Sequence, residues 1–573
     1  MPLSQAVKEL TAAANARSTN WEAGAARSQT LGEAIEKYKA KYGLLPPPNF
    51  DKWYQFALAN GSPVIDHFTQ IHNDLLPFWS LEPSTIRQRT SYLAEHSGLG
   101  ISLLRIRNGT CDYSPNIPGS HRWMMDSMQR MVEPFVKWLP DMDVAMNLGD
   151  ECQMAIPFEE MREHKSVARK AMANMMRPGN RSQNSTTMNF NGSQWPSSWS
   201  TPLPNKVTSP FFSDYIRWQI YHDLVSPSCP PQSLARRKRW WDWSTLCVEC
   251  TIPHTIFTDE GSLVADVSLA KDLCHQPDIA HLNGFIMSPA AMLGTNKLFP
   301  IFSQGRVGGF SDIMIPSPWN FDKKSLYNES LDRTWEDKSE ALFWRGSSSD
   351  GYAAYNSWMG FLRARFGNEA YQRATAPEPT VTEETLKINV SFAGTISKCH
   401  QVDCDTELHT FNKWAKDMHL ASGEINNDET VRRLSTKVAP FEDNWNFRHL
   451  IDMDGAGFSG RFLPFLKSHS LVYRAGIFQA WFDERLTAWQ HYVPIDIRLG
   501  SGAWALFDFF SGKTHKGGRE HAQKIAEQGR TWALKALRPE DMQIYMFRLL
   551  LEWGRVVDDD REHLGLVSEV DAL

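Results

Sequence analysis

The loop at residues 341–351, ALFWRGSSSDG, contains residue types that bind anions. A short apolar strand, residues 341–344, is expected to end in small and polar residues. Arg345 offers a planar set of N–H donors, and Gly346 lets a ligand approach the backbone closely. Ser347 and the two serines after it add hydroxyls and consecutive backbone N–H groups. The alternative is an ordinary strand-to-helix turn in which the serines cap the helix.

A second glycine-rich loop lies further along the chain, at residues 452–461, DMDGAGFSGR. It follows an expected strand at residues 447–451, and Arg461 is expected to open a helix. Helix N-termini direct free N–H groups towards anions, and glycines allow a ligand to come close. The sequence therefore contains two strand–loop segments with the chemistry to bind an anion.

A carboxylate follows a third expected strand. Residues 143–148, DVAMNL, are mostly apolar, and Gly149, Asp150 and Glu151 come directly after them. Open α/β sheets place functional groups at the carboxyl ends of their strands. Asp150 is therefore a candidate for a chemical role, and the alternative is an aspartate that caps the next helix.

Composition restricts the class of protein. With 573 residues the chain is too long for one core, and 42% apolar with 22% charged residues is typical of globular proteins. A net charge of −6 argues against a nucleic acid as the main partner. The 22 tryptophans and 31 phenylalanines are unusual, and some are expected to line a groove, since flat rings stack on sugars. Residues 235–244, ARRKRWWDWS, are a candidate wall of such a groove, although patches of this kind more often form a solvated helix face.

The eight cysteines include two close pairs, Cys247 with Cys250 and Cys399 with Cys404. The pairs are far apart, and no His-x-x-x-His sequence follows either, which argues against a zinc site. Disulfide bonds in an oxidising compartment are the favoured interpretation, and buried reduced thiols are the alternative. Five N-glycosylation sequons point the same way, at Asn108, Asn184, Asn191, Asn328 and Asn389.

Hydrophobic periodicity and turn residues predict the elements that must position these groups. Alternating strands and helices after residue 447 favour a doubly wound α/β arrangement. In chain order, we expect helices at residues 31–42, 127–138, 354–366, 521–537 and 539–556, buried strands at residues 284–288, 298–303, 471–475 and 489–497, and an exposed loop at residues 178–210.

No run of about eighteen apolar residues occurs, so no membrane-spanning segment is expected. The first residues lack the apolar core of a signal peptide, and the last ones are not a lumenal retention sequence. If the protein enters the secretory pathway, we expect its targeting segment and membrane anchor to be absent from this chain.

Five blocks of the sequence, in matching order, resemble those of glycosyltransferase family 90: FSDIMIPSPWN, LFWRGSSSDG, DMDGAGFSGRF, SHSLVYR and WQHYVPIDI. This family contains fungal capsule-associated xylosyltransferases and animal protein O-glucosyl- and O-xylosyltransferases. The first two blocks, with HLNGFIMSP before them, resemble the fungal branch more closely. The resemblance extends from about Leu31 to Arg561.

The resemblance implies an α/β fold of the GT-B type, in which two Rossmann-like domains face each other across a cleft. The implied units are a helical N-terminal extension at residues 1–115, an acceptor-side domain at residues 116–330, a donor domain at residues 331–540 and a C-terminal helix at residues 541–573. The implied location is the secretory pathway, in the Golgi lumen.

The implied reaction transfers a sugar, xylose in the fungal branch, from a UDP-sugar co-substrate onto a mannose-containing glycan or glycoprotein. The anomeric centre is inverted and a β-linkage forms, which requires a general base and positive groups for the departing diphosphate. The resemblance assigns the base to Asp150 and donor contacts to Ser347, Ser459 and Arg461. The full expected donor-binding set, extended by chemistry and proximity, is Arg345, Gly346, Ser347, Asp454, Gly455, Ala456, Gly457, Phe458, Ser459, Gly460 and Arg461.

One departure from the family concerns the diphosphate. The glucosyltransferases carry a further donor-binding arginine six residues after the serine that corresponds to Ser347, and Ala353 stands there in this chain. Arg461, together with Arg363 or Arg365, is expected to meet the diphosphate instead.

Several alternatives stay open at this point. Asp452 and Asp454 form an Asp-x-Asp pair that could hold a manganese ion, whereas Gly455 and Arg461 suit diphosphate binding without an obligatory metal. The protein could be a UDP-glucose-dependent protein O-glucosyltransferase, a glycoside hydrolase that uses Asp150 with a second carboxylate, or a non-catalytic glycan-binding protein. We expect no cofactor besides the UDP-sugar and no nucleic-acid partner.

Overall fold

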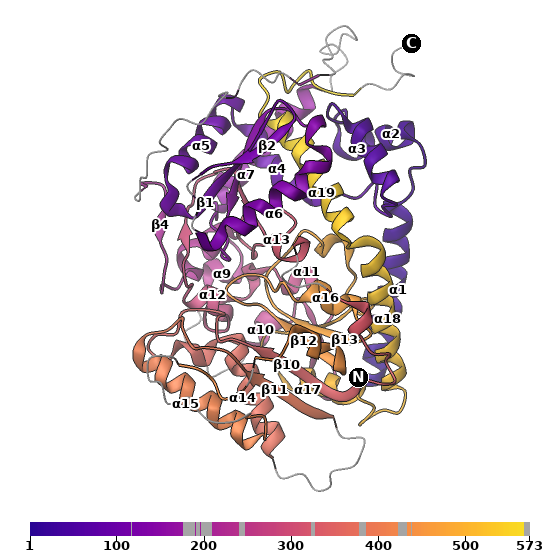
Figure 1. The fold of residues 1–573 in the computed structure, drawn as a ribbon, viewed down its shortest axis with the longest axis vertical. Helices are drawn as coiled ribbons and strands as arrows, with labels where there is room; N and C mark the ends of the chain where they lie inside the picture. Colours follow the sequence, from indigo (N-terminus) through magenta and orange to yellow (C-terminus); the bar gives the residue numbers. More distant parts are fainter. Residues whose placement is uncertain are drawn as a thin grey trace.

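The computed structural model describes residues 1–115, 117, 119–175, 189–190, 195, 209–239, 247–322, 327–376, 386–421, 432–436 and 438–566. Most of the loop expected at residues 178–210, and the tryptophans of residues 235–244, lie outside these ranges. Within them the chain forms two five-stranded sheets surrounded by helices (Figure 1). This mixed α/β arrangement is compatible with the expected fold class.

The first sheet has antiparallel and parallel neighbours. β1 (Ile101–Arg107) pairs antiparallel with β2 (Thr110–Tyr113) and with β3 (Met142–Asn147). β8 (Ile301–Ser303) and β9 (Ile313–Met314) continue the sheet in parallel from β3. β3 is the strand expected from DVAMNL, and all of its residues are buried.

The second sheet is entirely parallel, in the order β11, β10, β12, β13, β14. The strands expected before the two anion-binding loops are present. Those expected at residues 298–303 and 489–497 are shorter than predicted. The strands of this sheet are β10 (Ser339–Gly346), β11 (Lys387–Phe392), β12 (Phe447–Met453), β13 (Leu471–Ala475) and β14 (Val493–Ile495).

Two predicted helices match the structure residue for residue, α2 (Leu31–Tyr42) and α19 (Pro539–Val556). Gly43 ends α2 in the left-handed conformation, with a φ of 65°, which glycine adopts without steric cost. The helix expected at residues 127–138 is α6, which starts and ends earlier than predicted. A 3₁₀ turn follows it, because Pro134 cannot continue the α-helical hydrogen bonding.

Two other expectations are wrong. The segment expected as a strand at residues 284–288 contains helix α12 (Gly284–Met287) instead, because the side chain of Asn283 accepts the N–H of Ile286 and starts a helical turn. The helix expected at residues 354–366 is delayed until α14. Tyr355 and the asparagine after it have φ values of 54° and 63°, which a right-handed helix excludes.

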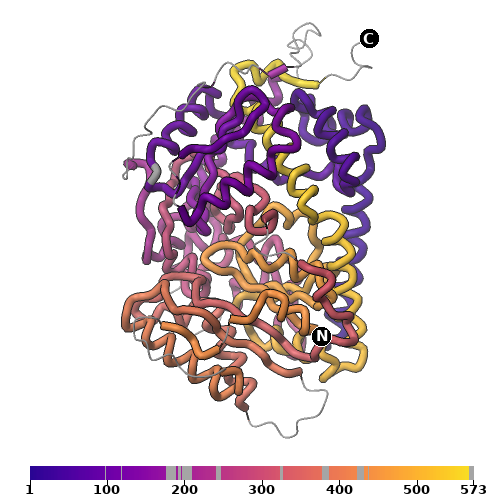
Figure 2. Tube along the Cα trace, viewed as in Figure 1, coloured from indigo at the N-terminus to yellow at the C-terminus, as the bar shows by residue number. Residues whose placement is uncertain are grey.

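The helices at the two ends of the chain pack together. Figures 1 and 2 show α1 alongside α18 and α19 reaching the N-terminal helices. The indole of Trp53 donates to the carbonyl of Ile544 in α19 (3.0 Å), and the rings of Trp21 and Trp532 lie 6.1 Å apart. The helices involved, besides α2 and α19, are α1 (Leu3–Ala25), α3 (Phe50–Ala59), α4 (Thr69–Leu75), α5 (Pro83–Glu95) and α18 (Gly518–Ala536).

The remaining elements surround the sheets. The helices are α6 (Arg122–Val132), α7 (Phe158–Met175), α8 (Ser226–Ser228), α9 (Leu234–Arg237), α10 (Val248–Thr251), α11 (Val267–Ala270), α12 (Gly284–Met287), α13 (Pro318–Phe321), α14 (Leu362–Thr375), α15 (Gln401–Asp417), α16 (Phe462–Lys467) and α17 (Ser501–Phe510). Two small antiparallel pairs are formed by β4 (Ser213–Asp214) with β7 (Leu293–Gly294) and by β5 (Thr255–Phe257) with β6 (Ser262–Val264).

Disulfide bonds form at Cys229–Cys274, Cys247–Cys250 and Cys399–Cys404. Each of the two close pairs is therefore bonded internally, which confirms the predicted disulfides. Cys111 and Cys152 are free thiols, and burial raises the pKa of both.

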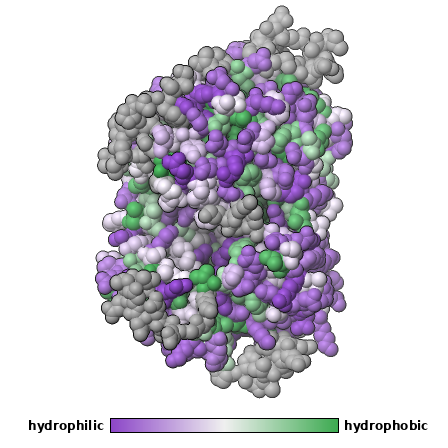
Figure 3. All heavy atoms as spheres, viewed as in Figure 1, coloured by the Kyte–Doolittle hydropathy of each residue, from purple (hydrophilic) through white to green (hydrophobic). Residues whose placement is uncertain are grey.

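The face of the molecule drawn in Figure 3 is mostly hydrophilic, with hydrophobic residues scattered over it. Among the described residues, no helix combines the length and the apolar character needed to cross a membrane. The predicted domain boundaries at residues 115, 330 and 540 stay a prediction.

Candidate active site

The two loops identified in the sequence follow neighbouring strands of the second sheet. The serine loop, residues 347–351, follows β10. The glycine loop, residues 454–461, follows β12, and β12 pairs in parallel with β10. The chain passes from β10 to β11 on one side and then to β12 on the other, so the loops lie where the strand order reverses. Open α/β sheets bind ligands at this point, outside the carboxyl ends of the strands.

Arg363, at the start of α14, fastens the two loops to each other. Its guanidinium donates to the carbonyl of Ser347 (2.9 Å) and to the carbonyl of Asp454 (2.9 Å). A longer hydrogen bond reaches the carbonyl of Met453 (3.4 Å). Arg363 is therefore used to hold the loops in register, and backbone carbonyls occupy its donors.

Arg461 lies at the N-terminus of α16, as predicted. Its guanidinium donates to the carbonyl of Arg345 (2.5 Å) and lies 5.8 Å from the ring centre of Trp344. Burial and the proximity of Arg363 lower its pKa to about 10, while Asp452 acts in the opposite direction. It remains a cation at neutral pH, at the junction of both loops.

Hydrogen bonds shape the serine loop. The hydroxyl of Ser347 donates to Ser349 (2.9 Å), and that of Ser348 donates to the buried carboxyl of Glu407 (3.1 Å). The alternative in which these serines cap the next helix is wrong, because α14 begins only at Leu362. Burial raises the pKa of the Glu407 carboxyl to about 8; the hydrogen bond from the serine opposes this, and nearby aspartates add to it.

Arg345 points towards β11. Its guanidinium donates to the carbonyl of Asn389 (2.8 Å) and to the side-chain oxygen of the same residue. Burial lowers the pKa of Arg345 to about 10. Both terminal nitrogens thus already have acceptors within the protein.

A cavity of about 460 Å³ opens beside the serine loop. Its volume lies in the range of small-molecule binding pockets. Its wall consists of Arg345 and Gly346, the three serines, residues 393–395, Ser397 and two apolar residues, Val438 and Ala439. These small side chains leave backbone groups within reach of a ligand.

Protein donors engage both carboxylates of the Asp-x-Asp pair. Asp454 accepts the backbone N–H groups of Ile477 (2.6 Å) and Phe478 (3.1 Å), and burial raises its pKa to about 6. Asp452 accepts the hydroxyl of Ser459. Asp454 therefore fixes the glycine loop against the segment after β13. Asp452, in β12, orients the side chain of Ser459.

Asp150 is exposed and lies directly against the glycine loop. Asn147, the last residue of β3, donates to the carbonyl of Glu151 (2.8 Å) and accepts the N–H of Gly149 (2.9 Å), which fixes the turn that carries Asp150. A Cβ atom at Gly457 would lie 2.1 Å from the carbonyl oxygen of Asp150. The structure therefore brings the predicted base and the predicted donor loop into backbone contact.

Residues near the first sheet support the glycine loop from the other side. The side chain of Asn320 donates to the carbonyl of Gly460 (2.8 Å). Arg306 and Gln479 exchange backbone hydrogen bonds of 3.1 and 2.7 Å. No local sequence pattern indicates these contacts, apart from the position of Asn320 in one of the five blocks.

Glu151 is a buried carboxyl that the sequence prediction did not assign. It accepts the backbone N–H groups of Ala290 (3.1 Å) and Ala291 (3.3 Å). Burial raises its pKa, the neighbouring Asp150 raises it further, and Lys398 lowers it. Glu151 thus anchors the Asp150 turn to the segment after α12.

Arg365 donates to the carbonyls of Leu282 (2.8 Å) and Ile497 (2.7 Å). Burial raises the pKa of Asp350 in the serine loop, and the charges of Arg363 and Arg365 oppose this rise. The expectation that Arg365 could meet the diphosphate stays a prediction. Ala353 uses its backbone to pair with the segment around Cys399.

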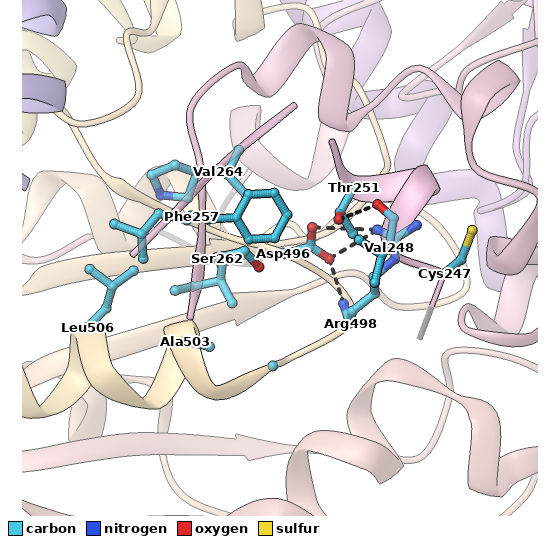
Figure 4. Close-up of a pocket in the computed structure, with 14 residues that line it drawn as sticks. Cys247, Val248, Thr251, Phe257, Ser262, Val264, Asp496, Arg498, Ala503 and Leu506 are labelled. Atoms are coloured by element: carbon cyan, nitrogen blue, oxygen red, sulfur yellow. Dashed lines mark hydrogen bonds and ion pairs between the residues drawn. The ribbon is translucent and has the colours of Figure 1, made fainter. Parts of the chain in front are cut away.

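Figure 4 shows a smaller cavity of about 100 Å³ near β14. Asp496 there pairs with Arg498 (3.1 Å) and with Nε2 of His254 (2.8 Å). Burial alone would raise the pKa of Asp496, but Arg498 and His254 hold it below its ordinary value.

Beside this cavity, Cys247, Cys250 and Asp278 are the one group of three potential metal ligands among the described residues, and the two cysteines are bonded to each other. The charged groups here satisfy one another, and the volume is small for a nucleotide.

Comparison with protein families gives one match. Residues 397–567 match the model of Glycosyl transferase family 90. The matched region includes the glycine loop, whereas Asp150 and the serine loop precede it.

Curated relatives are similar over limited parts of the chain. An O-glucosyltransferase rumi homolog of Aedes aegypti is 29% identical over 136 residues, 22% of this chain and 31% of the relative. Protein O-glucosyltransferase 1 of Bos taurus is 28% identical over 130 residues, which are 22% of this chain and 31% of the relative. Protein O-glucosyltransferase 1 of Mus musculus is 25% identical over 264 residues, which are 45% of this chain and 57% of the relative. The chain thus spans about a third of the length of the first of these relatives. Together these matches show that part of this chain is similar to glycosyltransferases of family 90.

Proposed function

We propose that this protein is an inverting glycosyltransferase of the GT-B type that moves a sugar from a UDP-sugar onto a glycan hydroxyl, forming a β-linkage. The observation that carries the proposal is the meeting of three segments at one place. The serine loop and the glycine loop follow adjacent strands where the strand order reverses, and Asp150 touches Gly457. A base thus stands beside an anion-binding loop, as sugar transfer from a nucleotide requires.

The donor is proposed to span the two loops. Its nucleoside would occupy the cavity of about 460 Å³ beside the serine loop. Its diphosphate would lie over the backbone N–H groups of the glycine loop, near Arg461 at the start of α16. This arrangement directs the anomeric carbon of the sugar towards Asp150.

In the proposed mechanism the carboxylate of Asp150 takes the proton of the acceptor hydroxyl, and the hydroxyl oxygen attacks the anomeric carbon. The bond between that carbon and the β-phosphate oxygen breaks, and its electron pair leaves with UDP. Attack from the face opposite the leaving group inverts the anomeric centre. Arg461 and the loop N–H groups stabilise the negative charge that develops on UDP.

The identity of the sugar rests on sequence resemblance. The blocks LFWRGSSSDG and FSDIMIPSPWN resemble the fungal branch, so we propose UDP-xylose as donor and a mannose-containing glycan as acceptor. The second candidate is UDP-glucose-dependent O-glucosyl transfer to a protein, which the names of the relatives favour. We further propose a location in the secretory pathway, in the Golgi lumen, because three disulfides suit an oxidising compartment.

The proposal includes diphosphate binding without an obligatory metal. Asp454 accepts two backbone N–H groups, and Asp452 accepts the hydroxyl of Ser459, so both carboxylates have protein donors. Transfer should therefore persist in EDTA. Complete loss of transfer in EDTA, with rescue by manganese, would support the Asp-x-Asp metal alternative.

The test of the proposed function is a panel of UDP-sugars, each measured for protection of the full chain against thermal unfolding. The UDP-sugar that protects best is then used in transfer assays with mannose-containing glycans and with proteins. Release of free sugar from glycans without any nucleotide would favour a hydrolase. Glycan binding without any affinity for UDP would favour a non-catalytic binding protein.

Asp150→Asn is expected to lower the rate of transfer by about 10²–10⁴-fold, because an amide cannot accept the acceptor proton. Protection by UDP should persist, since the loops are unchanged. Asp259→Asn, at an exposed aspartate outside the site, is the matched control and should keep normal transfer. Near-normal turnover of Asp150→Asn would show that another group is the base.

A further inference from the structure

A second cavity, of about 380 Å³, lies between α1, α18 and the turn at residues 487–492 before β14. It shares no residue with the serine loop, the glycine loop or the Asp150 turn, and its volume is in the range of small-molecule pockets. Its wall is polar or charged apart from one tryptophan ring. The lining residues are Glu22, Gln490, His491, Lys524, Glu527, Gln528, Thr531, Trp532 and Lys535.

Close backbone packing forms the side of the cavity that the turn contributes. Helix α18 packs on the turn at Gly529, where an added Cβ atom would lie 2.2 Å from the carbonyl oxygen of His491. Trp489, within the turn, has a φ of 70°, which is uncommon for a large side chain. Its indole donates to the carbonyl of Val264 (2.7 Å). This packing holds Gln490 and His491 at the cavity.

The side chain of Gln490 has a polar atom without a partner. Gln490 lines the cavity and is only 9% exposed. Its amide oxygen is buried and accepts no hydrogen bond from any residue that the structure describes. An unsatisfied buried polar atom costs free energy, and a ligand that supplies a donor recovers it. The environment of Gln490 therefore points to a ligand with a hydrogen-bond donor.

The imidazole of His491 brings a donor to the cavity wall without bringing a charge. Its Nδ1 accepts the backbone N–H of Thr487 (3.0 Å), so the ring proton lies on Nε2. Burial lowers the pKa of His491 to about 3, which keeps the ring neutral. The ring stacks on Trp532 with centroids 6.0 Å apart, and the indole of Trp532 donates to the carbonyl of Arg485 (2.7 Å). Both rings are therefore fixed in place.

The charges around the cavity balance one another. Lys524 and Lys535 are matched by Glu22 and Glu527, and His491 is neutral. A lining without net charge favours a neutral ligand over a phosphate or a carboxylate. Donors and acceptors are mixed, which suits hydroxyl groups, because a hydroxyl donates and accepts at once. A sugar carries several hydroxyls on a compact ring, and its apolar face packs against aromatic rings and lysine stems.

We propose that this cavity binds a neutral saccharide unit, at a site separate from the proposed site of sugar transfer. The amide oxygen of Gln490 accepts a hydrogen bond from one sugar hydroxyl. The imidazole N–H of His491 and the ammonium groups of Lys524 and Lys535 donate to other hydroxyl oxygens. Binding here requires no transfer, so it is measured apart from the proposed function.

The test uses the full chain and a mannobiose that carries a photoreactive diazirine group, with labelled peptides identified by mass spectrometry. In the wild type, label should appear on peptides from residues 487–492 or 518–536, and excess unmodified mannobiose should suppress it. Gln490→Ala should lower this labelling by about threefold to tenfold, as expected for the loss of one hydrogen bond.

A second variant avoids the buried turn. Lys524→Ala, at an exposed lysine of the lining, should lower the same labelling by about twofold to fivefold. Lys516→Ala, at an exposed lysine just before α18 and outside the lining, is the matched control and should label like the wild type.

Three results would overturn the saccharide site. Label that excess mannobiose does not suppress would show that no saccharide is held. Equal labelling of both lining variants and the wild type, or label confined to other peptides, would place the sugar elsewhere. Suppression by inorganic phosphate as strong as by mannobiose would identify an anion site instead. Absence of transfer with every UDP-sugar, while the expected labelling persists, would contradict the proposed function and leave the saccharide site supported.

Discussion

Gly457 is the residue at which the glycine loop meets the turn that carries Asp150. Its neighbour across the contact is the carbonyl of Asp150, and there is no room for a side chain between them. Asn147 fixes the turn on one side, and Asn320 holds the glycine loop on the other. The distance between the glycine loop and the Asp150 turn is therefore set by backbone contact, which is more rigid than contact through long side chains.

Gly457→Ala should force the glycine loop away from Asp150. We expect a loss of stability of about 1–3 kcal/mol from overpacking and a fall in transfer of about a hundredfold from misplacement of the donor. Thermal unfolding and steady-state kinetics measure the two effects. Gly32→Ala, where an added Cβ meets nothing within 4 Å, is the control and should leave transfer unchanged. Wild-type kinetics in Gly457→Ala would show that the contact is not needed for catalysis.

At the scale of elements, α15 supports the serine loop and the turn after it. Its residue Asp403 accepts the backbone N–H groups of Tyr355 (3.0 Å) and Asn356 (2.6 Å), which stabilises two residues of positive φ. One turn later, Glu407 accepts the hydroxyl of Ser348. The Cys399–Cys404 disulfide joins the start of the helix to the preceding turn. The helix thus acts as a brace for the cavity wall.

Glu407 should make stability depend on pH. Its carboxyl has a pKa raised from 4.5 to about 8, mainly by burial, so the folded protein binds more protons than the unfolded chain between those values. The free energy of unfolding therefore falls as pH rises from about 4.5 to 8. Glu407→Gln removes this dependence, and its stability relative to the wild type should rise by about 1–3 kcal/mol across that window.

Chemical denaturation of the wild type and Glu407→Gln at pH 5 and at pH 9 measures this difference. Glu260→Gln, at an exposed carboxyl, is the control and should show a constant difference from the wild type. If the difference in unfolding free energy between Glu407→Gln and the wild type is also the same at pH 5 and at pH 9, the Glu407 carboxyl is ionised in the folded protein.

At the scale of the whole molecule, the last helix ties the N-terminal helices to the first sheet. The indole of Trp553 in α19 donates to the carbonyl of Asp143 in β3 (3.3 Å) and packs against Phe78 and Phe302. β3 is the strand that ends at the Asp150 turn. The packing of α19 therefore stabilises the strand that leads to the Asp150 turn, from a position near the end of the sequence.

Trp553→Ala should leave a large cavity against β3. The expected cost is about 3–5 kcal/mol of unfolding free energy, with reduced transfer because the strand that positions Asp150 loses its support. Denaturant midpoints and transfer assays measure both. Trp218→Ala, at a tryptophan that is 68% exposed, should not change stability. Equal stability losses in the two variants would contradict this packing argument.

The sequence was most informative where structure is local. The strands before both loops, the start of α16 at Arg461 and the end of α2 at Gly43 follow from periodicity, capping and glycine conformation. It failed at residues 284–288, where a capping asparagine outweighed an apolar pattern that suits strand and helix alike. It does not reveal that Arg365 donates to the carbonyls of Leu282 and Ile497, because the direction of a long side chain depends on which acceptors surround it.

The sequence by itself therefore determined the chemical groups and the strands that carry them: Asp150, the serine loop and the glycine loop. The tertiary structure alone decided that these segments meet and that Arg363 fastens the loops. The physical reason is that residue chemistry and periodicity are properties of short segments. Contact between Asp150 and Gly457 depends instead on how two separate sheets pack, which no local pattern encodes.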